Sequence, residues 1–338
     1  MRRCIQLAKN GLGTTYPNPL VGSVIVFKDK IIGEGWHKQS GKSHAEVNAI
    51  NSVKNQKLLT KATIYVNLEP CSHFGKTPPC ANLIIEKGIK NVVIGSKDPN
   101  PKVSGKGVEL LKENSCNVIQ GVLEKECNDL NKRFFTFFGK KRPYIILKWA
   151  ETLDGFISPK FKNKKKPVWI TNKNSRQLVH QWRSQEQAIL VGTTTVIKDN
   201  PCLTTRDWIG RSPIRVVIDK KLKIPFDATI FDCNIKTIVV TEIKKENKLN
   251  LTYQIIDFSK NITHQICDLL CEHKVQSLIV EGGTKTLQTF INRNLWDEAR
   301  IFRGNTLFYE GTKAPTIKGQ EISETKIEQD FLKILLND

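Results

Sequence analysis

Long apolar segments are absent from this chain of 338 residues, and no apolar stretch follows its basic N-terminus. A membrane-spanning helix needs roughly 20 consecutive apolar residues, and no run approaches that length. Met1-Arg2-Arg3 is basic, but Gln6, Lys9 and Asn10 stand where a signal peptide would carry its apolar region. We therefore expect a soluble, cytoplasmic protein with no membrane partner.

The chain also lacks a framework of paired cysteines. It has nine cysteines, an odd number, and their spacing suggests no set of disulfides. This usage agrees with a reducing compartment. The length suggests two domains of ordinary size, each able to bury its own core.

Acidic residues are scarce relative to basic ones, with 33 Asp and Glu against 53 Lys and Arg, for a formal net charge of +20. Such a balance suggests a nucleic-acid partner. However, the excess is spread over both halves, and no basic helix is interleaved with aromatic residues that would stack on bases. We expect general surface basicity that attracts phosphorylated small molecules, and no nucleic-acid partner.

Three short segments carry the ligand set of a catalytic zinc ion: His44-Ala45-Glu46, Pro70-Cys71 and Cys80. A catalytic zinc keeps three protein ligands, here one His and two Cys, and leaves a fourth position for water. Glu46 is then free to move protons, as the non-ligating Glu of zinc nucleobase deaminases does. The alternative is a set of small buried thiols beside a hydrogen-bonded His, because nine cysteines produce some pairs by chance.

The sequence around these residues predicts helix starts and strand ends. Residues two apart on a helix do not share a face, so His44 and Glu46 should lie at a helix entrance, with Gly41-Lys42-Ser43 as the turn and possible N-cap. Residues 62–68 form an apolar strand that leads to Cys71. Pro78-Pro79 favours a helix that begins near Cys80, where the N-terminal dipole stabilises a thiolate.

Strands and helices alternate in both halves, which predicts an α/β fold. The charged, proline-terminated break at residues 139–143 is the best domain boundary and gives domains 1–142 and 143–338. We expect strands at 22–27, 31–36, 62–68, 91–95, 144–150, 188–191, 214–218, 237–240 and 277–280, and helices near 105–114, 123–138, 174–183, 262–273 and 284–292.

The second half has its own site signal, a strand that runs through Val280-Glu281-Gly282-Gly283 into a helix at Thr284. Such a turn lets backbone N–H groups hold a phosphate, although the spacing is not that of a Rossmann fingerprint and a simple tight turn is the alternative. Residues 152–155 and 191–201 likewise place Gly, hydroxyl and carboxylate groups after apolar strands, where open α/β sheets bind ligands. The basic run 162–166 is a solvated loop or lies near an anionic cofactor.

Taken together, these motifs resemble those of the bifunctional riboflavin-biosynthesis family, a pyrimidine deaminase fused to a pyrimidine-nucleotide reductase. The resemblance covers nearly the whole chain and includes the eight-residue gap between Cys71 and Cys80, where nucleic-acid deaminases usually have Cys-x-x-Cys. The motifs that carry it are Pro17-Asn18-Pro19-Leu20-Val21-Gly22, His44-Ala45-Glu46, residues 69–80, Leu153-Asp154-Gly155, Trp169-Ile170-Thr171, residues 189–192, Asp199-Asn200-Pro201 and Val280-Glu281-Gly282-Gly283.

The resemblance implies a cytidine-deaminase-like domain at residues 1–142, followed by a dihydrofolate-reductase-like domain at residues 143–338. The first domain would bind one Zn²⁺ per chain and deaminate a diaminopyrimidinone ribose 5-phosphate. The second would reduce the ribosyl side chain of the product with NADPH. The family also implies a homo-oligomer formed through the reductase domain.

The resemblance further implies site residues. Glu46 would be the catalytic acid and base, and Asn18, His37 and Lys76 would contact the first substrate, although Asn18 could simply cap a turn. Cofactor contacts fall at Ala150, Trp169, Thr195, Asp199, Gly283, Thr284, Lys285, Thr286, Leu287, Gln288 and Thr289. Substrate contacts fall at Pro167, Arg183, Leu203, Arg206 and Glu281. The two arginines suit a phosphate, with a surface salt bridge as the alternative.

Three rival hypotheses remain open from the sequence. A nucleic-acid base deaminase agrees with the charge and the zinc motif, but not with the long gap between Cys71 and Cys80. A non-catalytic protein with a structural zinc would need a fourth ligand in place of a free Glu46. A deaminase with an inactive reductase half is the third, because Pro167 replaces a small polar residue and the segment from Ile301 onward departs from the family pattern.

Overall fold

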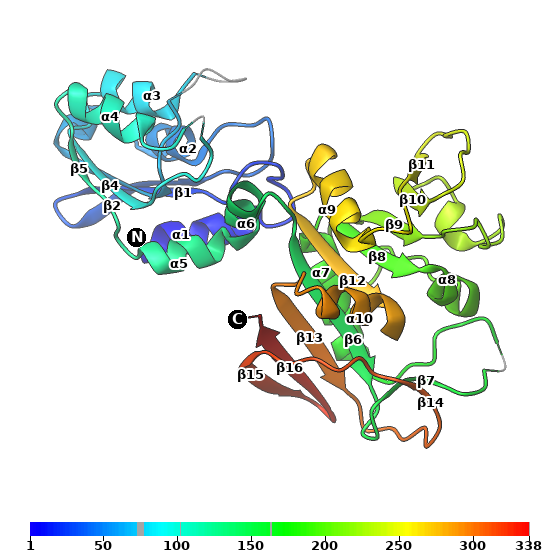
Figure 1. The fold of residues 1–338 in the computed structure, drawn as a ribbon. Helices are drawn as coiled ribbons and strands as arrows, with labels where there is room; N and C mark the ends of the chain where they lie inside the picture. The colour runs from blue at the N-terminus through cyan, green and yellow to red at the C-terminus, as the bar shows by residue number, and fades with distance from the viewer. Residues whose placement is uncertain (73–77, 102, 163, 338) are drawn as a thin grey trace. The chain divides into compact units, whose positions relative to one another are not determined.

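The computed structural model describes residues 1–72, 78–101, 103–162 and 164–337. The chain divides into two compact units, Met1–Lys141 and Arg142–Asp338, and each is described by itself (Figure 1). The division falls one residue before the boundary expected from the sequence. Within the described parts of the chain, no helix combines the length and the apolar character needed to cross a membrane.

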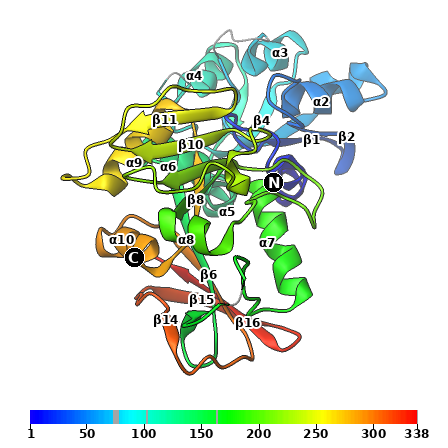
Figure 2. The ribbon, with the colours of Figure 1, turned by 90° about the vertical axis from the view of Figure 1, so that its right-hand side faces the viewer.

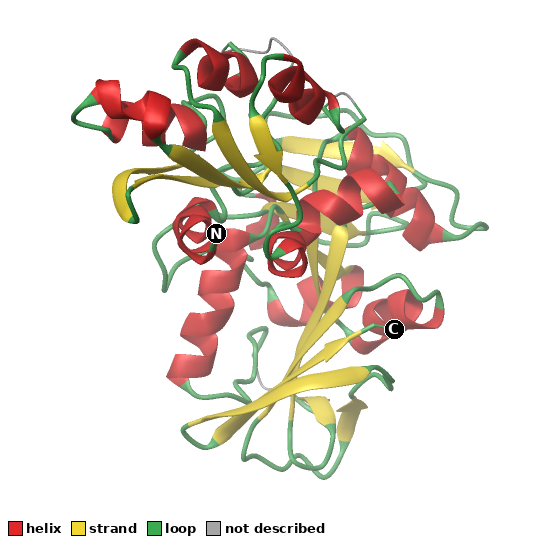
Figure 3. Cartoon of the chain, turned by 90° about the vertical axis from the view of Figure 1, so that its left-hand side faces the viewer, coloured by secondary structure: helices red, strands yellow, loops and turns green. Residues whose placement is uncertain are grey.

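Unit 1 has a five-stranded sheet in the order β2-β1-β3-β4-β5, covered by helices on both faces (Figure 3). β1 is antiparallel to β2 and β3, while β3, β4 and β5 are parallel to one another. The strands are β1 (Gly22–Phe27), β2 (Lys30–Trp36), β3 (Thr63–Leu68), β4 (Asn91–Ser96) and β5 (Asn117–Ile119). The helices are α1 (Arg2–Ala8), α2 (Ala45–Ser52), α3 (Cys80–Glu86), α4 (Lys106–Glu113), α5 (Glu124–Leu130) and α6 (Lys132–Lys140).

The main core of unit 1 lies between the sheet and helices α2, α3 and α4. Ile25, Ile64 and Ile94 project from three strands into this core, where Ile50 of α2 and Ile84 of α3 meet them. A smaller apolar cluster packs α1 on the opposite face of the sheet. Because β3 and β4 are parallel, the segments that follow them leave the sheet at the same edge.

One predicted helix of unit 1 is wrong: residues 123–138 form two helices, α5 and α6, rather than one. The break is at Asn131, whose buried side chain accepts a hydrogen bond from the backbone N–H of Leu20 at 2.8 Å and donates one to its carbonyl at 2.9 Å. This pairing with a segment 111 residues away has no signature in the local helical pattern.

Unit 2 is built on a nine-stranded sheet in the order β11-β10-β9-β8-β12-β6-β13-β16-β15. The strands from β11 to β13 in this order are parallel, and β16 and β15 complete one edge as antiparallel strands. The bounds are β6 (Tyr144–Glu151), β8 (Ala188–Gly192), β9 (Ile214–Ile218), β10 (Thr237–Thr241), β11 (Leu251–Ile255), β12 (Ser277–Gly282), β13 (Glu298–Arg303), β15 (Gln320–Ile327) and β16 (Asp330–Leu336).

Helices cover both faces of this sheet (Figure 2). α9 (Ile262–Glu272) and α10 (Thr284–Asn292) pack on one face, and α7 (Lys173–Gln185) and α8 (Thr193–Asp199) on the other. A separate pair of strands, β7 (Phe156–Pro159) and β14 (Gly311–Lys313), lies beside the sheet. The expected strands and helices of this half are confirmed, whereas α8, β7, β11 and the C-terminal strands had not been predicted.

Candidate active sites

The three predicted zinc ligands meet at the sheet edge of unit 1 where β3 ends. His44 is the N-cap of α2, Cys80 is the first residue of α3, and Cys71 follows β3. The Nδ1 atom of His44 lies 3.3 Å from the Cys80 Sγ atom and 3.6 Å from the Cys71 Sγ atom. The helix entrance predicted for His44 and Glu46 is confirmed, although the N-cap is His44 itself and not Ser43.

These separations fit a tetrahedral zinc ion. With Zn–N near 2.0–2.1 Å and Zn–S near 2.3 Å, tetrahedral geometry places the nitrogen about 3.6 Å from each sulfur. The three ligand atoms all lie within 4.8 Å of one another, and no other group of this kind occurs among the described residues. His44, Cys71 and Cys80 therefore form the zinc site.

Protons in the site are distributed unevenly. The Cys80 thiol, the His44 ring and the backbone N–H of Cys80 all face the Cys71 sulfur and lower the pKa of Cys71, against the effect of burial. The same contact with Cys71 raises the pKa of Cys80 and the pKa of His44. The lowered pKa favours the thiolate form of Cys71, which is the form that binds a metal.

Glu46 is buried, only 3% exposed, and lies beside the ligands as the second residue of α2. Burial raises the pKa of its carboxyl. The charge of nearby His44 and a hydrogen bond donated by the Cys80 thiol act in the opposite direction but do not outweigh burial. A carboxyl that is destabilised as an anion and lies next to a metal site is suited to take up and release protons.

A second buried carboxylate, Glu69, holds the Cys71 segment against the start of α4. Its oxygens accept hydrogen bonds from the backbone N–H groups of Asp98, Gly105, Gly107 and Val108 at 3.0–3.3 Å. A Cβ atom on Gly107 would lie 2.1 Å from the Pro70 carbonyl oxygen, so this close approach requires glycine. The chain thereby fixes the backbone on the N-terminal side of Cys71.

The expected substrate contacts Asn18 and His37 lie next to each other beside the zinc ligands. The Nδ1 atom of His37 lies 3.1 Å from the Ser43 carbonyl, so Nδ1 carries the proton and donates to that oxygen, while the Asn18 amide donates to Nε2 at 3.0 Å. The His37 ring packs edge-on against the ring of His44, with centroids 5.3 Å apart. Lys76, the third expected contact, lies outside the described residues.

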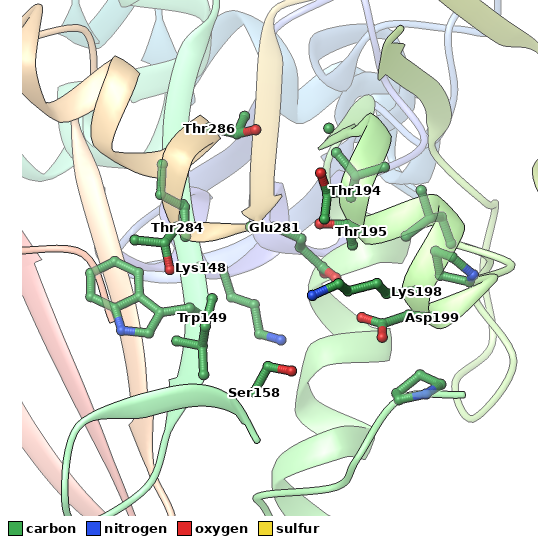
Figure 4. A pocket seen from close by; sticks show the side chains of 18 of the residues that line it. Lys148, Trp149, Ser158, Thr194, Thr195, Lys198, Asp199, Glu281, Thr284 and Thr286 are labelled. Carbon is green, nitrogen blue, oxygen red and sulfur yellow. The ribbon is translucent and has the colours of Figure 1, made fainter. Parts of the chain in front are cut away.

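Unit 2 contains a cavity of about 770 Å³ at the carboxyl ends of β6, β8 and β12. Figure 4 shows Glu281 near its centre, between Thr284 of α10 and the α8 residues Thr195 and Asp199. The cavity brings together nearly all the residues predicted for the reductase half. These are Ala150, Pro167, Trp169, Arg183, Thr195, Asp199, Leu203, Arg206, Glu281, Gly283, Thr284, Lys285, Thr286, Leu287 and Thr289.

Gln288 is the exception among the predicted residues, because it does not line this cavity. Its side chain bonds the Thr316 segment instead: Oε1 accepts from the Thr316 backbone N–H at 2.9 Å, and Nε2 donates to the Thr316 carbonyl at 3.2 Å. Alternate positions on a helix point in different directions, so a run of seven consecutive residues cannot all face one ligand.

Arg183 forms an ion pair with Glu281, another side chain of the cavity. It donates to both oxygens of Glu281, at 3.2 and 2.7 Å, and to the Thr204 carbonyl at 3.2 Å. Burial raises the pKa of Glu281, but Arg183 and Lys148 outweigh it and lower that pKa to about 2. Arg183 is therefore ion-paired, as in the alternative considered from the sequence, but the pair is buried within the cavity and not at the surface.

The cavity also contains residues that were not among the predicted contacts, although Lys162 belongs to the basic run expected in a solvated loop or near an anionic cofactor. Lys148 lies within β6, and burial lowers its pKa although Glu281 raises it. Lys162 pairs with Asp199, and Arg176 stacks on the ring of Trp169 at 4.5 Å. A lysine inside an otherwise apolar strand is a signal that could have identified Lys148. The pairing of Lys162 has no such signal, since 37 residues separate it from Asp199.

Comparisons with known proteins agree with both sites. Residues 1–96 match the model of the cytidine and deoxycytidylate deaminase zinc-binding region, and residues 143–334 match the model of the RibD C-terminal domain. Riboflavin biosynthesis protein RibD of Aquifex aeolicus is 40% identical over 330 residues, which cover 96% of this chain and 91% of that protein. The same-named protein of Bacillus amyloliquefaciens is 39% identical and covers 94% of this chain and 86% of its own length.

A crystal structure from Thermotoga maritima, a diaminohydroxyphosphoribosylaminopyrimidine deaminase/5-amino-6-(5-phosphoribosylamino)uracil reductase, superposes with a TM-score of 0.90 at 39% identity and covers 100% of this chain and 97% of that one. Acinetobacter baumannii RibD superposes equally well at 32% identity, covering 100% and 97%. These matches confirm the expected fold class of a deaminase domain followed by a reductase domain. The chain belongs to the RibD family of bifunctional riboflavin-biosynthesis enzymes, in which a zinc-dependent deaminase is joined to a reductase.

Proposed function

We propose that the chain catalyses two successive reactions on one phosphorylated pyrimidine. Unit 1 removes an amino group from a diaminopyrimidinone ribose 5-phosphate, and unit 2 reduces the ribosyl side chain of the product with NADPH. One observation supports this most directly: a His/Cys/Cys zinc site beside a buried, non-ligating Glu46 stands on the same chain as an arginine-lined cavity. The Thermotoga maritima relative carries both corresponding activities in its name.

In unit 1, His44, Cys71 and Cys80 would hold the zinc ion, which would activate a water molecule for attack on the base. Glu46 moves the protons of the reaction. It accepts one from the attacking water and delivers it to a ring nitrogen. It then accepts the remaining proton of the added hydroxyl and gives it to the departing amino group, which leaves as ammonia. Burial raises the pKa of Glu46, which makes it easier for the carboxyl to accept a proton than for an exposed one.

In unit 2 the nicotinamide supplies the hydride, and the chain positions the two partners. The start of α10, from Gly283 to Thr286, offers backbone N–H groups and hydroxyls to the cofactor phosphates. Arg206 is the better candidate for the substrate phosphate, because Arg183 is already paired with Glu281. Arg183 instead holds the carboxylate of Glu281 in its ionised form within the cavity.

The test is an assay that follows the two reactions separately. The purified zinc-loaded chain is given the diaminopyrimidinone nucleotide, and ammonia release and NADPH absorbance are recorded with and without each component. We expect ammonia without NADPH, and NADPH oxidation only after deamination or on direct addition of 5-amino-6-(5-phosphoribosylamino)uracil. Release of ammonia from tRNA but not from the nucleotide would refute the assignment of unit 1, and ammonia without oxidation would refute that of unit 2. A homo-oligomer formed through unit 2 stays a prediction.

A further inference from the structure

His180 is a buried histidine of unit 2 that the proposed chemistry leaves without a role. It lies on α7, lines the cavity and is 5% exposed. Both of its ring nitrogens face the segment that carries Arg206. The backbone N–H of Arg206 donates to the Nδ1 atom at 3.1 Å, and the Nε2 atom lies 3.5 Å from a carboxylate oxygen of Asp207.

These contacts determine where the proton of the ring resides. A backbone N–H can only donate, so the Nδ1 atom must present a lone pair to Arg206. The neutral ring therefore carries its proton on Nε2, which faces Asp207. A second proton would have to go on Nδ1, where it would meet the Arg206 N–H and break the hydrogen bond.

The same helix face holds this segment at a second point. Arg183 lies three residues after His180, so both side chains project from one side of α7. Arg183 donates to the Thr204 carbonyl at 3.2 Å, and the Thr204 hydroxyl accepts from the Arg206 guanidinium at 3.1 Å. The segment 204–206 is thereby bonded to α7 through the Thr204 carbonyl at one end and the Arg206 N–H at the other. The hydrogen bond to the Thr204 hydroxyl fixes the direction of the Arg206 guanidinium.

We propose that His180 is a positioning residue that, in its neutral form, holds Arg206 where its guanidinium binds the phosphate of the pyrimidine substrate. This inference rests on the reductase function proposed above. Both ring nitrogens of His180 face the Arg206–Asp207 segment, so its contribution is to substrate affinity and not to hydride transfer. A flexible Arg206 would lose side-chain and backbone freedom on each binding event, which the contact with His180 avoids.

The charged groups around the ring favour this neutral form. Burial lowers the pKa of His180, and the nearby guanidinium groups of Arg183 and Arg206 lower it further, while Asp207 and Glu281 raise it. The net direction is downward from the ordinary value of about 6.5. His180 is therefore neutral at neutral pH, and the hold on Arg206 is lost only as the pH falls through the lowered pKa.

The experiment compares two substitutions of His180 in the full-length, zinc-loaded enzyme. His180→Ala removes the acceptor, whereas His180→Asn offers an amide oxygen near the position of Nδ1 and does not titrate. We expect His180→Ala to raise the KM for 5-amino-6-(5-phosphoribosylamino)uracil about tenfold, since a buried N–H loses its acceptor. The kcat of reduction, the KM for NADPH and ammonia release by unit 1 should stay within about twofold, and His180→Asn should restore the KM.

Two further measurements separate positioning from a general structural effect. With a substrate that lacks the phosphate, His180→Ala and the unmodified enzyme should have the same KM; equal losses on both substrates would overturn the inference. As the pH falls below about 6.5 and through the lowered pKa of His180, the KM of the unmodified enzyme should rise relative to that of His180→Asn, and this ratio cancels the titration of the phosphate itself. A constant ratio would overturn the pH dependence, and an unchanged KM in His180→Ala would overturn the inference as a whole. If the unmodified enzyme oxidises no NADPH, the proposed function fails instead.

Discussion

The two candidate sites achieve specificity in different ways. The zinc site of unit 1 is three ligand atoms within 4.8 Å of one another, taken from the starts of two helices and the end of one strand. The cavity of unit 2, about 770 Å³ in volume, is shaped by residues from most of the strands and helices around it. A metal site depends on a few atoms of the right chemistry, whereas a cofactor cavity depends on shape and backbone.

The two buried carboxylates show the same contrast. Burial raises the pKa of Glu46 more than His44 lowers it, whereas Glu281 lies between Arg183 and Lys148, which lower its pKa to about 2. One carboxyl is suited to exchange protons, and the other stays ionised over the whole physiological range. The difference teaches that burial alone does not decide the role of a carboxyl, because the neighbouring cations reverse its effect.

Loss of one zinc ligand should have the largest effect, because it should abolish deamination in unit 1 and leave reduction in unit 2 intact. Cys71→Ala removes the sulfur that is set up as a thiolate, so we expect zinc content to fall from one ion per chain to none and deamination to disappear. Reduction of added 5-amino-6-(5-phosphoribosylamino)uracil should continue. Atomic absorption and the two separate assays measure these effects. Cys116→Ala, at a buried cysteine in the core of the same unit, is the matched control and should keep its zinc.

A substitution of Glu46 should remove proton transfer and leave zinc binding intact. Glu46→Gln keeps the size of the side chain but cannot accept a proton, so ammonia release should fall by about 10²- to 10⁴-fold. Zinc content should stay at one ion per chain, because Glu46 is not a ligand. Normal ammonia release by this variant would mean that another group moves the protons.

The sequence predicted the zinc site well because metal chemistry admits few residue types. His44, Cys71 and Cys80 belong to a motif of restricted residue types, and helix-start signals such as Pro78-Pro79 are local. The alternation of apolar segments likewise predicted most strands of both units. These features depend on neighbouring residues, so a single sequence contains them.

Features that depend on distant pairs could not be predicted in this way. Asn131 interrupts a helical pattern because it bonds Leu20, and Arg183 is neutralised by Glu281, which is 98 residues away. The antiparallel strand β16 joins the sheet through its pairing with β13, and β15 is attached through β16. Contacts of this kind also explain why Arg183 was assigned to a phosphate although its guanidinium is already paired.

The ion pair of Glu281 should contribute more to stability than any exposed pair. Glu281→Gln leaves Arg183 buried without a counter-charge, which should lower the free energy of unfolding of unit 2 by about 3–5 kcal/mol. Five of the six tryptophans lie in unit 2, so urea unfolding followed by tryptophan fluorescence reports mainly on this unit. The control is Glu310→Gln, whose pair with Lys160 is exposed and should contribute no more than about 1 kcal/mol.

The same pair gives unit 2 a pH dependence with a definite sign. The folded pKa of Glu281, about 2, is below the value of about 4.3 for a carboxyl in an unfolded chain. The stabilisation is therefore present in full above about pH 4.5 and is lost as the pH falls toward 2. Glu281→Gln should remove this part of the acid sensitivity. An unchanged acid transition in the variant would contradict the assignment.

The smallest expected effect concerns the edge of the cofactor site. Gln288 lies in the run predicted to bind NADPH, but its amide is bonded to the backbone of Thr316 and does not line the cavity. Gln288→Ala should therefore leave the KM for NADPH within about twofold and lower stability by about 1 kcal/mol, the contribution of a typical hydrogen bond. Thr286→Ala, two residues earlier on the cavity side, should raise that KM several-fold. A comparable rise in both variants would mean that the cofactor reaches beyond the cavity and displaces the Thr316 segment.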